Sequence, residues 1–502
     1  MNEELKKNLD TVSSILKEAS VYDHACHVLN FDMETICPPK AMEEQGNVIA
    51  FLGNQSFRLV KSPEFEKASA YIYEHRDELE NVYDKALAES LNRDREWNRN
   101  ITPEMNEEFS RAYNKSYVDW VNAKQKDDYS VFAPSLKTVR DIELKKISLK
   151  ENAKANAYDN LLDLYERGIT EKDLDECFEK CKQRLIPLLK KIMASKKKIR
   201  TDFMSRTVTD EEQKRMAEYL LKVMGFDFER GSFTTTEHPF TDGLAKDDVR
   251  VTTHYYPDMF YSSMFSIIHE GGHALFEMNQ DPECFDHHME SSMTMGMHES
   301  VSRFYENRIG RSKEFIHLIY PETIKIFPEL KDVSERELYE AMNIVQPSLI
   351  RTEADEFTYT FHIIIRYEIE KMILRGEADI KDLPEIWNRK YEEYLGIRPA
   401  SDKEGVLQDV HWASGFGYFP TYALGNMYNS MYFNTMNKDF DLSSAVSEGR
   451  FDQINGWMKD HVWKKACRLD SKTWIKDITG CDFTTDDFLD YLEAKYSELY
   501  EL

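Results

Sequence analysis

The sequence predicts a large, mainly α-helical fold with a small β element. Apolar residues recur at helical spacing up to about residue 225 and again from about residue 259. Between them, 226–258 is rich in β-branched residues around turn residues. With 502 residues, 41% of them hydrophobic, the chain is long enough to bury a large core. No boundary separates independent domains, so we expect one unit, 1–502, made of 1–225, 226–258 and 259–502.

The N-terminal part carries regular helical stripes. Four apolar residues near the start are three or four positions apart, which places them on one helix face. They are Leu5, Leu9, Val12 and Leu16. Similar stripes occur in 60–93, 103–128, 136–163 and 173–199. The Pro38–Pro39 pair is expected to break the chain between early helices.

The β element is expected to be a short hairpin or a small sheet. Segments 232–236 and 249–256 are rich in Thr, Val and aromatic residues, and Pro239 and Gly243 lie between them. Helical patterning then resumes and continues to the C-terminus. An irregular segment is expected after Trp412, where Gly415, Gly417, Pro420 and Gly425 occur.

Charge and composition exclude several classes of partner. The formal net charge of −26 would repel a phosphate backbone, so we expect no nucleic-acid partner. No stretch reaches the roughly 20 apolar residues of a membrane span, and 1–17 lacks the apolar run of a signal peptide. Seven scattered cysteines do not suggest a disulfide scaffold. Cys177 and Cys181 lie one helical turn apart, but no second pair or nearby His completes a metal site, so both are interpreted as ordinary thiols. We therefore predict a cytoplasmic protein with no membrane partner.

Residues 269–273 read His-Glu-Gly-Gly-His within an apolar stretch typical of a buried helix. Positions four apart share one helix face, so His269 and His273 can point at one cation. Glu270 lies beside that face and can act as a general base on water. Gly271 and Gly272 weaken the helix, and we expect them to admit a substrate or another backbone.

A catalytic zinc site needs a third protein ligand. Glu299, in a second helical stretch, is the best candidate, and Glu306 is expected to support one imidazole from the same face. His287 and His288 are rival ligands, but they lie in a polar loop and we expect neither to bind the metal. A hydrogen-bonding group must also steady the tetrahedral oxyanion. The candidates for that group are His411, Tyr418 and Tyr422.

Several ordered blocks of the chain resemble the carboxypeptidase Taq family of zinc-type metallocarboxypeptidases. The blocks are Asp32–Thr35 with Pro38–Pro39, His238–Phe240, Asp248 with Arg250 and Thr252, 269–273, His298–Ser300, Ile350–Arg351 with Ala354–Asp355, Gly405 with Gln408, Asp409, His411 and Trp412, and Gly417–Pro420 with Tyr422. The tail from about Trp457 to Tyr496 is similar too, so the likeness spans nearly the whole chain. Two positions depart from the family pattern, Val301 in place of Gln and His254 in place of Arg.

The resemblance implies a helical fold with a deep central groove, a homodimer, and removal of C-terminal residues from peptides with broad preference. The metal would be zinc, or cobalt in some members. Arg351 is the expected clamp for the free peptide carboxylate, because Arg offers two parallel donors. The alternative is a structural pair of Arg351 with Glu353 or Asp355. The resemblance also places Arg250, as an alternative clamp, and His238, His411 and Tyr422 around the substrate.

Two other functions remain open from the sequence. An endo-acting oligopeptidase would share every metal residue and lack only the carboxylate clamp. A peptide-binding scaffold that has lost catalysis is the second alternative, and the intact set of His269, Glu270, His273 and Glu299 argues against it.

Overall fold

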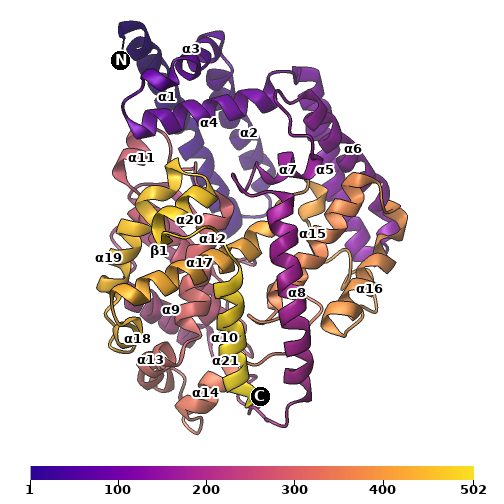
Figure 1. The fold of residues 1–502 in the computed structure, drawn as a ribbon, viewed down its shortest axis with the longest axis vertical. Helices are drawn as coiled ribbons and strands as arrows, with labels where there is room; N and C mark the ends of the chain where they lie inside the picture. The colour runs from indigo at the N-terminus through magenta and orange to yellow at the C-terminus, as the bar shows by residue number, and fades with distance from the viewer. Residues whose placement is uncertain (1) are drawn as a thin grey trace.

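Helices make up most of the computed structural model, which describes residues 2–502 (Figure 1). The helices before the sheet are α1 (Glu3–Thr35), α2 (Met42–Val60), α3 (Pro63–Glu74), η1 (Arg76–Glu78), α4 (Val82–Asn98), α5 (Pro103–Lys126), η2 (Tyr129–Val131), α6 (Ala133–Leu149), α7 (Ala157–Leu162), α8 (Glu171–Ala194) and α9 (Asp210–Met224). The mainly helical prediction is confirmed. The stripes 60–93 and 136–163 each span more than one helix, because Asn81 and Asn156 cap new helices within them.

The helices after the sheet carry the C-terminal half. They are α10 (Phe260–Asn279), α11 (Pro282–Asp286), α12 (Met295–Arg303), η3 (Phe304–Gly310), α13 (Lys313–Ile326), η4 (Pro328–Leu330), α14 (Glu335–Met342), η5 (Arg351–Glu353), α15 (Tyr359–Arg375), η6 (Ile380–Asp382), α16 (Leu383–Leu395), η7 (His411–Ala413), α17 (Pro420–Asp439), α18 (Leu442–Ser447), α19 (Phe451–His461), η8 (Trp463–Arg468), α20 (Ser471–Thr479) and α21 (Asp486–Tyr500). The last helix, α21, packs on α8, where Arg184 Nε donates to Glu493 at 2.7 Å.

The irregular segment predicted after Trp412 is shorter than expected. Gly415 and Gly417 have positive φ angles and lie outside helices, as the pattern indicated. Pro420, however, is the first residue of α17, a position that Pro favours because its missing N–H has no partner to lose there. Gly425 lies inside the same helix, so its role is in packing and not in a turn.

The β element is a three-stranded sheet of β1 (Gly231–Thr235), β2 (Thr241–Ala245) and β3 (Asp248–Thr253). The central strand β3 pairs in parallel with β1 and antiparallel with β2. Val249 and Val251 of β3 are fully buried, and the sheet packs against α10. The prediction of a small sheet just before the histidine-bearing helix is confirmed.

Two hydrophobic cores lie inside the molecule. A large core extends from Trp97 to Tyr500, and a small core joins α1, α3 and α4. Leu5 and Val12 of the predicted first stripe belong to the small core. The N-terminal helices therefore pack mainly on one another at one end of the molecule (Figure 1).

One cysteine pair forms a bond that the sequence analysis did not predict. Cys284 of α11 and Cys467 of η8 are fully buried and form a disulfide across 183 residues. The sequence interpretation missed it because two cysteines so far apart carry no spacing signal. Cys177 and Cys181 are free thiols, and burial raises the pKa of each to about 12.

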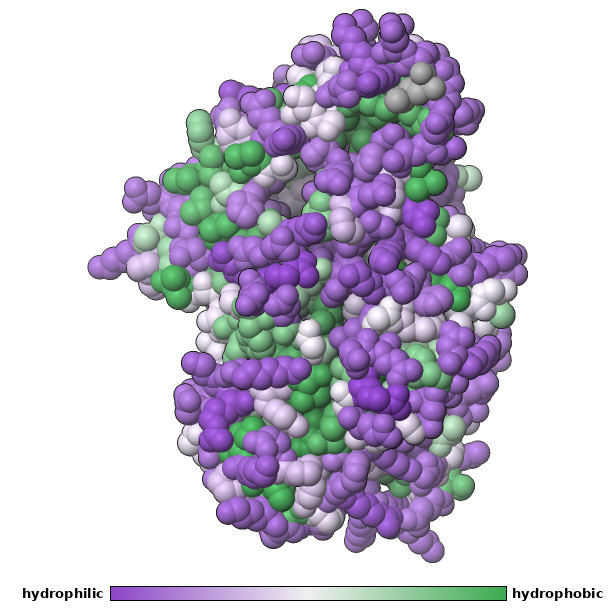
Figure 2. All heavy atoms as spheres, turned by 90° about the vertical axis from the view of Figure 1, so that its left-hand side faces the viewer, coloured by the Kyte–Doolittle hydropathy of each residue, from purple (hydrophilic) through white to green (hydrophobic). Residues whose placement is uncertain are grey.

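Among the described residues, no helix has the length and apolar content needed to cross a bilayer. Hydrophilic side chains cover much of the face in Figure 2, and hydrophobic side chains appear on it in separate patches. The deep central groove remains a prediction from the resemblance.

Candidate active site

Two helices cross in close contact at the centre of the site. Helix α10 carries His269 and His273, and α12 carries Glu299. A Cβ atom on Gly272 would lie 2.8 Å from the Cα of Ser302, so only glycine allows this approach. A Cβ atom on Gly271 would lie 3.0 Å from a Leu221 methyl group of α9. Of the two predicted uses of these glycines, the close approach of another backbone is confirmed at Gly272, and Gly271 makes room for the side chains of α9.

Helix α17 closes on the other side of α12. A Cβ atom on Gly425 would lie 2.8 Å from Glu299 Cγ, so this glycine lets α17 lie directly against the Glu299 side chain. Tyr422 lies one turn earlier on α17. Residues more than a hundred positions apart along the chain are therefore neighbours here.

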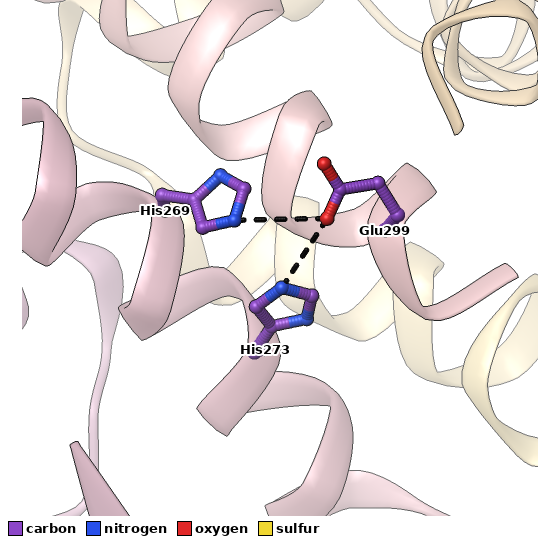
Figure 3. A group of neighbouring side chains, drawn as sticks. All are labelled: His269, His273 and Glu299. Atoms are coloured by element: carbon purple, nitrogen blue, oxygen red, sulfur yellow. Dashed lines mark ion pairs between the residues drawn. The ribbon is translucent and has the colours of Figure 1, made fainter. Parts of the chain in front are cut away.

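His269, His273 and Glu299 turn their polar atoms toward one point (Figure 3). His269 Nε2 lies 3.6 Å and His273 Nε2 lies 3.4 Å from the same Glu299 oxygen, Oε2. Tetrahedral zinc with bonds of about 2.0–2.2 Å has ligand atoms about 3.3–3.6 Å apart. The two-His, one-Glu donor set and its spacing therefore fit a divalent cation of this type. Only this group of His, Cys, Asp and Glu among residues 2–502 meets that description.

Two of these three residues have further charged or polar partners. His269 Nδ1 lies 2.8 Å from Glu306 Oε2, which confirms the expected contact between Glu306 and one imidazole. Arg303 Nε donates to Glu299 Oε1 at 2.6 Å, and Ser302 Oγ donates to Glu299 Oε2 at 3.0 Å. Burial raises the pKa of the Glu299 carboxyl, but Arg303 and His269 outweigh it and hold the pKa well below its usual value. Glu299 is therefore ionised, as a metal ligand must be.

The second histidine has a different partner. His273 Nδ1 lies 2.5 Å from His298 Nδ1. Burial, aided by His298, lowers the pKa of His273 to about 3, so this imidazole is neutral and has a lone pair to offer.

Glu270 is positioned by the sheet. Its carboxylate is buried, and Thr241 Oγ1 of β2 donates to Glu270 Oε2 at 2.8 Å. Burial raises the pKa of Glu270, which brings a carboxylate nearer to the proton affinity that a general base needs at neutral pH. Its position on α10 next to His269 leaves it outside the group of three metal-facing residues.

His411 and Tyr422 lie together on the α17 side. His411 Nε2 is 3.4 Å from the Tyr422 hydroxyl, and the rings meet edge to face. Burial lowers the pKa of His411 to about 4, so its imidazole is neutral at pH 7. Tyr418 packs edge to face against Tyr422 in the same aromatic group.

Arg351 is buried and held by two partners. Its Nε and Nη2 donate to Asp409 Oδ1 at 3.1 and 2.9 Å, and Nη1 donates to the Tyr359 hydroxyl at 3.1 Å. The Arg351 guanidinium also lies over the Tyr422 ring, 4.9 Å from its centre. The pairing with Glu353 or Asp355 considered from the sequence is not found; Asp355 instead accepts hydrogen bonds from Gln346 and Thr358.

Arg250 and His238 are less closely tied to the metal-facing group. Arg250 makes a two-bond contact with Asp248, 2.9 Å for each bond, and lies over the Phe31 ring. His238 lies in the loop between β1 and β2, and its side chain is exposed. The structure thus brings His269, His273 and Glu299 together and leaves Arg250 in a local pair on the sheet.

The rival ligands and the two departures make contacts outside the group of His269, His273 and Glu299. His287 Nδ1 pairs with Asp84 at 2.8 Å and His288 Nε2 contacts Ser13, so both face the N-terminal helices. Val301 is fully buried in the large core. His254 Nε2 bonds to Ser262 Oγ at 2.7 Å.

Four polar residues of the site carried no assignment from the sequence. Arg303 follows Glu299 by four positions and Glu277 follows His273 by four, so helical spacing alone is a signal for both. His298 adjoins Glu299, and Thr241 comes from a separate strand. Only the fold reveals that His298 contacts His273 and that Thr241 contacts Glu270. Arg303 contacts Glu299 and Glu277 contacts His298.

Comparisons with known proteins agree on one family. Residues 11–496 match the family model described as carboxypeptidase Taq (M32) metallopeptidase. The chain is 39% identical to carboxypeptidase 1 of Bacillus subtilis, over 97% of this chain and 98% of that protein. It is 35% identical to thermostable carboxypeptidase 1 of Pyrococcus furiosus, over 98% and 100% of the two chains. The crystal structure of the M32 carboxypeptidase from Deinococcus radiodurans superposes with a TM-score of 0.94 at 29% identity, over the full length of both chains.

Proposed function

The chain belongs to the carboxypeptidase Taq (M32) family of metallopeptidases, and on that premise we propose that His269, His273 and Glu299 hold its metal ion. As a member of this family with relatives named carboxypeptidases along its whole length, it is a metallocarboxypeptidase, a peptide hydrolase. The observation that carries the proposal is the convergence of two imidazole nitrogens on one carboxylate oxygen, at 3.4 and 3.6 Å.

The proposed metal is zinc, with cobalt as the alternative. Two imidazoles and one carboxylate form the ligand set typical of zinc peptidases, which keep a fourth position open. When bound, such a cation supplies Lewis acidity to a water molecule and to the scissile carbonyl. Each of the two histidines would bind the metal through Nε2, because its Nδ1 atom already contacts Glu306 or His298.

Glu270 is the proposed general base. It would accept a proton from the attacking water and deliver that proton to the leaving amine. The hydrogen bond from Thr241 leaves the other carboxylate oxygen of Glu270 available for this transfer. Tyr422 and His411 are the proposed donors to the oxyanion, and the neutral state of His411 means that it would act through one N–H and not as a cation.

Arg351 is the proposed clamp for the C-terminal carboxylate of the peptide. Asp409 is shared between Arg351 and Arg366, whose Nε donates to Asp409 Oδ2 at 2.5 Å. Two guanidinium groups and one carboxylate leave one net positive charge beside Tyr422, which supports recognition of an anion. Arg250 and His238 are proposed as further contacts to the substrate backbone.

We also propose a homodimer in the cytoplasm. Exposed apolar side chains that an interface could cover occur directly after α1, at Ile36, and on α2, at Phe51 and Phe57. Five cysteines remain free thiols, which suits a reducing compartment.

Removing one imidazole tests the proposed metal site. The His269→Ala variant should lose zinc, because two ligands hold the ion far less tightly than three. A matched control is His287→Ala, whose imidazole also pairs with a carboxylate but lies outside the site. Metal content after extensive dialysis, measured by mass spectrometry, should be near one zinc per chain for the control. Full zinc occupancy in His269→Ala would contradict the assignment.

A further inference from the structure

Behind His273, a chain of hydrogen bonds leads away from the proposed metal site. His273 Nδ1 lies 2.5 Å from His298 Nδ1, and His298 Nε2 lies 2.6 Å from Glu277 Oε1. The second oxygen of Glu277, Oε2, accepts a hydrogen bond from Gln280 Nε2 at 2.7 Å. We propose that Glu277 and His298 are positioning residues that fix the tautomer and the orientation of His273 for metal binding.

The direction of the chain follows from its last member. A carboxylate only accepts hydrogen bonds, so His298 Nε2 carries a proton and points it at Glu277. A His273 ring that offers its Nε2 lone pair to a metal carries its own proton on Nδ1, so His298 Nδ1 accepts that proton in the 2.5 Å contact. The lone pair of His273 is thereby left on Nε2, the atom that faces Glu299.

Helices α10 and α12 and strand β2 together hold this chain of hydrogen bonds in place. Glu277 follows His273 by one turn of α10, and His298 directly precedes Glu299 on α12. The Phe276 ring meets the His298 ring edge to face, with centres 4.8 Å apart. A Cβ atom on Gly243 of β2 would lie 2.9 Å from Glu277 Oε2, so this glycine leaves room for the carboxylate.

The two metal-facing histidines are therefore supported in different ways. His269 contacts the Glu306 carboxylate directly at 2.8 Å, whereas His273 reaches the Glu277 carboxylate only through His298. Partners of this kind typically change metal affinity 10–100-fold when they are removed. Loss of His298 should act on the metal through His273 alone, and Glu277 should act only through His298.

The test is the zinc dissociation constant, measured by competition with a chelator. His298→Ala and Glu277→Ala should each bind zinc about 10–100-fold more weakly than the unchanged protein. His298→Asn should lose less zinc affinity than His298→Ala, because the Asn side-chain oxygen can take the place of His298 Nδ1 as an acceptor. His287→Ala, which removes an imidazole paired with Asp84 far from the site, should bind zinc normally. The thermal unfolding midpoint of each metal-free variant separates loss of affinity from loss of the fold.

A double variant tests whether Glu277 acts on His273 only through His298. In the His298→Asn background, Glu277→Ala should cause no further loss, because its link to His273 is already cut. The inference would be overturned if both alanine variants kept the zinc affinity of the unchanged protein. It would also be overturned if His298→Ala and His298→Asn lost equal zinc affinity, or if the losses added up in the double variant. The inference rests on the proposed metal site. Zinc binding by the unchanged protein therefore separates failure of the hydrogen-bond chain from failure of the metal site. If the unchanged protein bound no zinc, both proposals would be overturned.

Discussion

His269 and His273 each use both ring nitrogens, one toward Glu299 and one toward a fixed partner. This division matters because an imidazole binds a metal only through a nitrogen that carries no proton. Sequence spacing alone identifies both histidines as candidates. It does not identify the partners that set their tautomers, since His298 and Glu277 meet His273 only after α10 and α12 have packed.

Glu270 gives the sharpest prediction at the scale of one residue. The Glu270→Gln variant should retain zinc and its unfolding temperature but lose about 10²–10⁴-fold in turnover, because only proton transfer is removed. Glu283→Gln, which neutralises an exposed carboxylate on α11, is the matched control and should keep full activity. Steady-state kinetics on a free-acid peptide measures both. Near-normal turnover in Glu270→Gln would assign the base to another group.

At the scale of the elements, glycines decide how closely the helices of the site approach. Gly272 lets α10 touch the backbone of α12, and Gly425 lets α17 touch Glu299. Gly53 of α2 is different, because a Cβ atom there would have no neighbour within 4 Å. Two glycines inside helices thus have opposite expected responses to the same substitution.

Gly272→Ala should separate α10 from α12, lower stability by about 1–3 kcal/mol and weaken zinc binding. Gly53→Ala should raise stability by up to about 1 kcal/mol through helix propensity and leave zinc binding unchanged. Thermal unfolding and zinc competition together report both effects. If Gly272→Ala matched the unchanged protein in stability and in zinc affinity, the close crossing of α10 and α12 would have no role in the site.

The elements also mark how far the sequence predicts this structure. Periodicity locates the helices, and β-branched residues locate the sheet, because both signals are local. The sequence did not predict that the irregular segment ends at Pro420. Gly425 is typical of a turn, and only the packing of α17 on Glu299 explains a glycine inside that helix. The partner of Arg351 was missed in the same way, because Asp409 lies 58 positions away along the chain.

For the molecule as a whole, the disulfide joins parts that are far apart in sequence. Cys284 and Cys467 link the segment after α10 to η8, and both belong to the small core of the N-terminal helices. A cross-link that closes so long a loop typically stabilises a protein by about 2–4 kcal/mol. It also bears on location, because disulfides persist mainly in oxidising compartments.

Counting thiols tests this link. In denaturant without reductant, five of the seven cysteines should react with a thiol reagent, and all seven after reduction. Cys284→Ala should lower the unfolding midpoint of the oxidised protein, whereas Cys481→Ala, at an exposed free thiol, should not. Seven reactive thiols before reduction would show that Cys284 and Cys467 are neighbours without a bond and would support the proposed reducing compartment.

For the whole enzyme, we propose a zinc-dependent peptidase that requires a free peptide C-terminus. Its most direct test is mass spectrometry of one peptide, as the free acid and as the C-terminal amide, incubated with the zinc-loaded protein. We expect a ladder of single-residue losses from the C-terminus of the free acid and none from the amide. Internal cleavage of both peptides would contradict the account and indicate an endo-acting oligopeptidase, and no cleavage of either would indicate a peptide-binding scaffold.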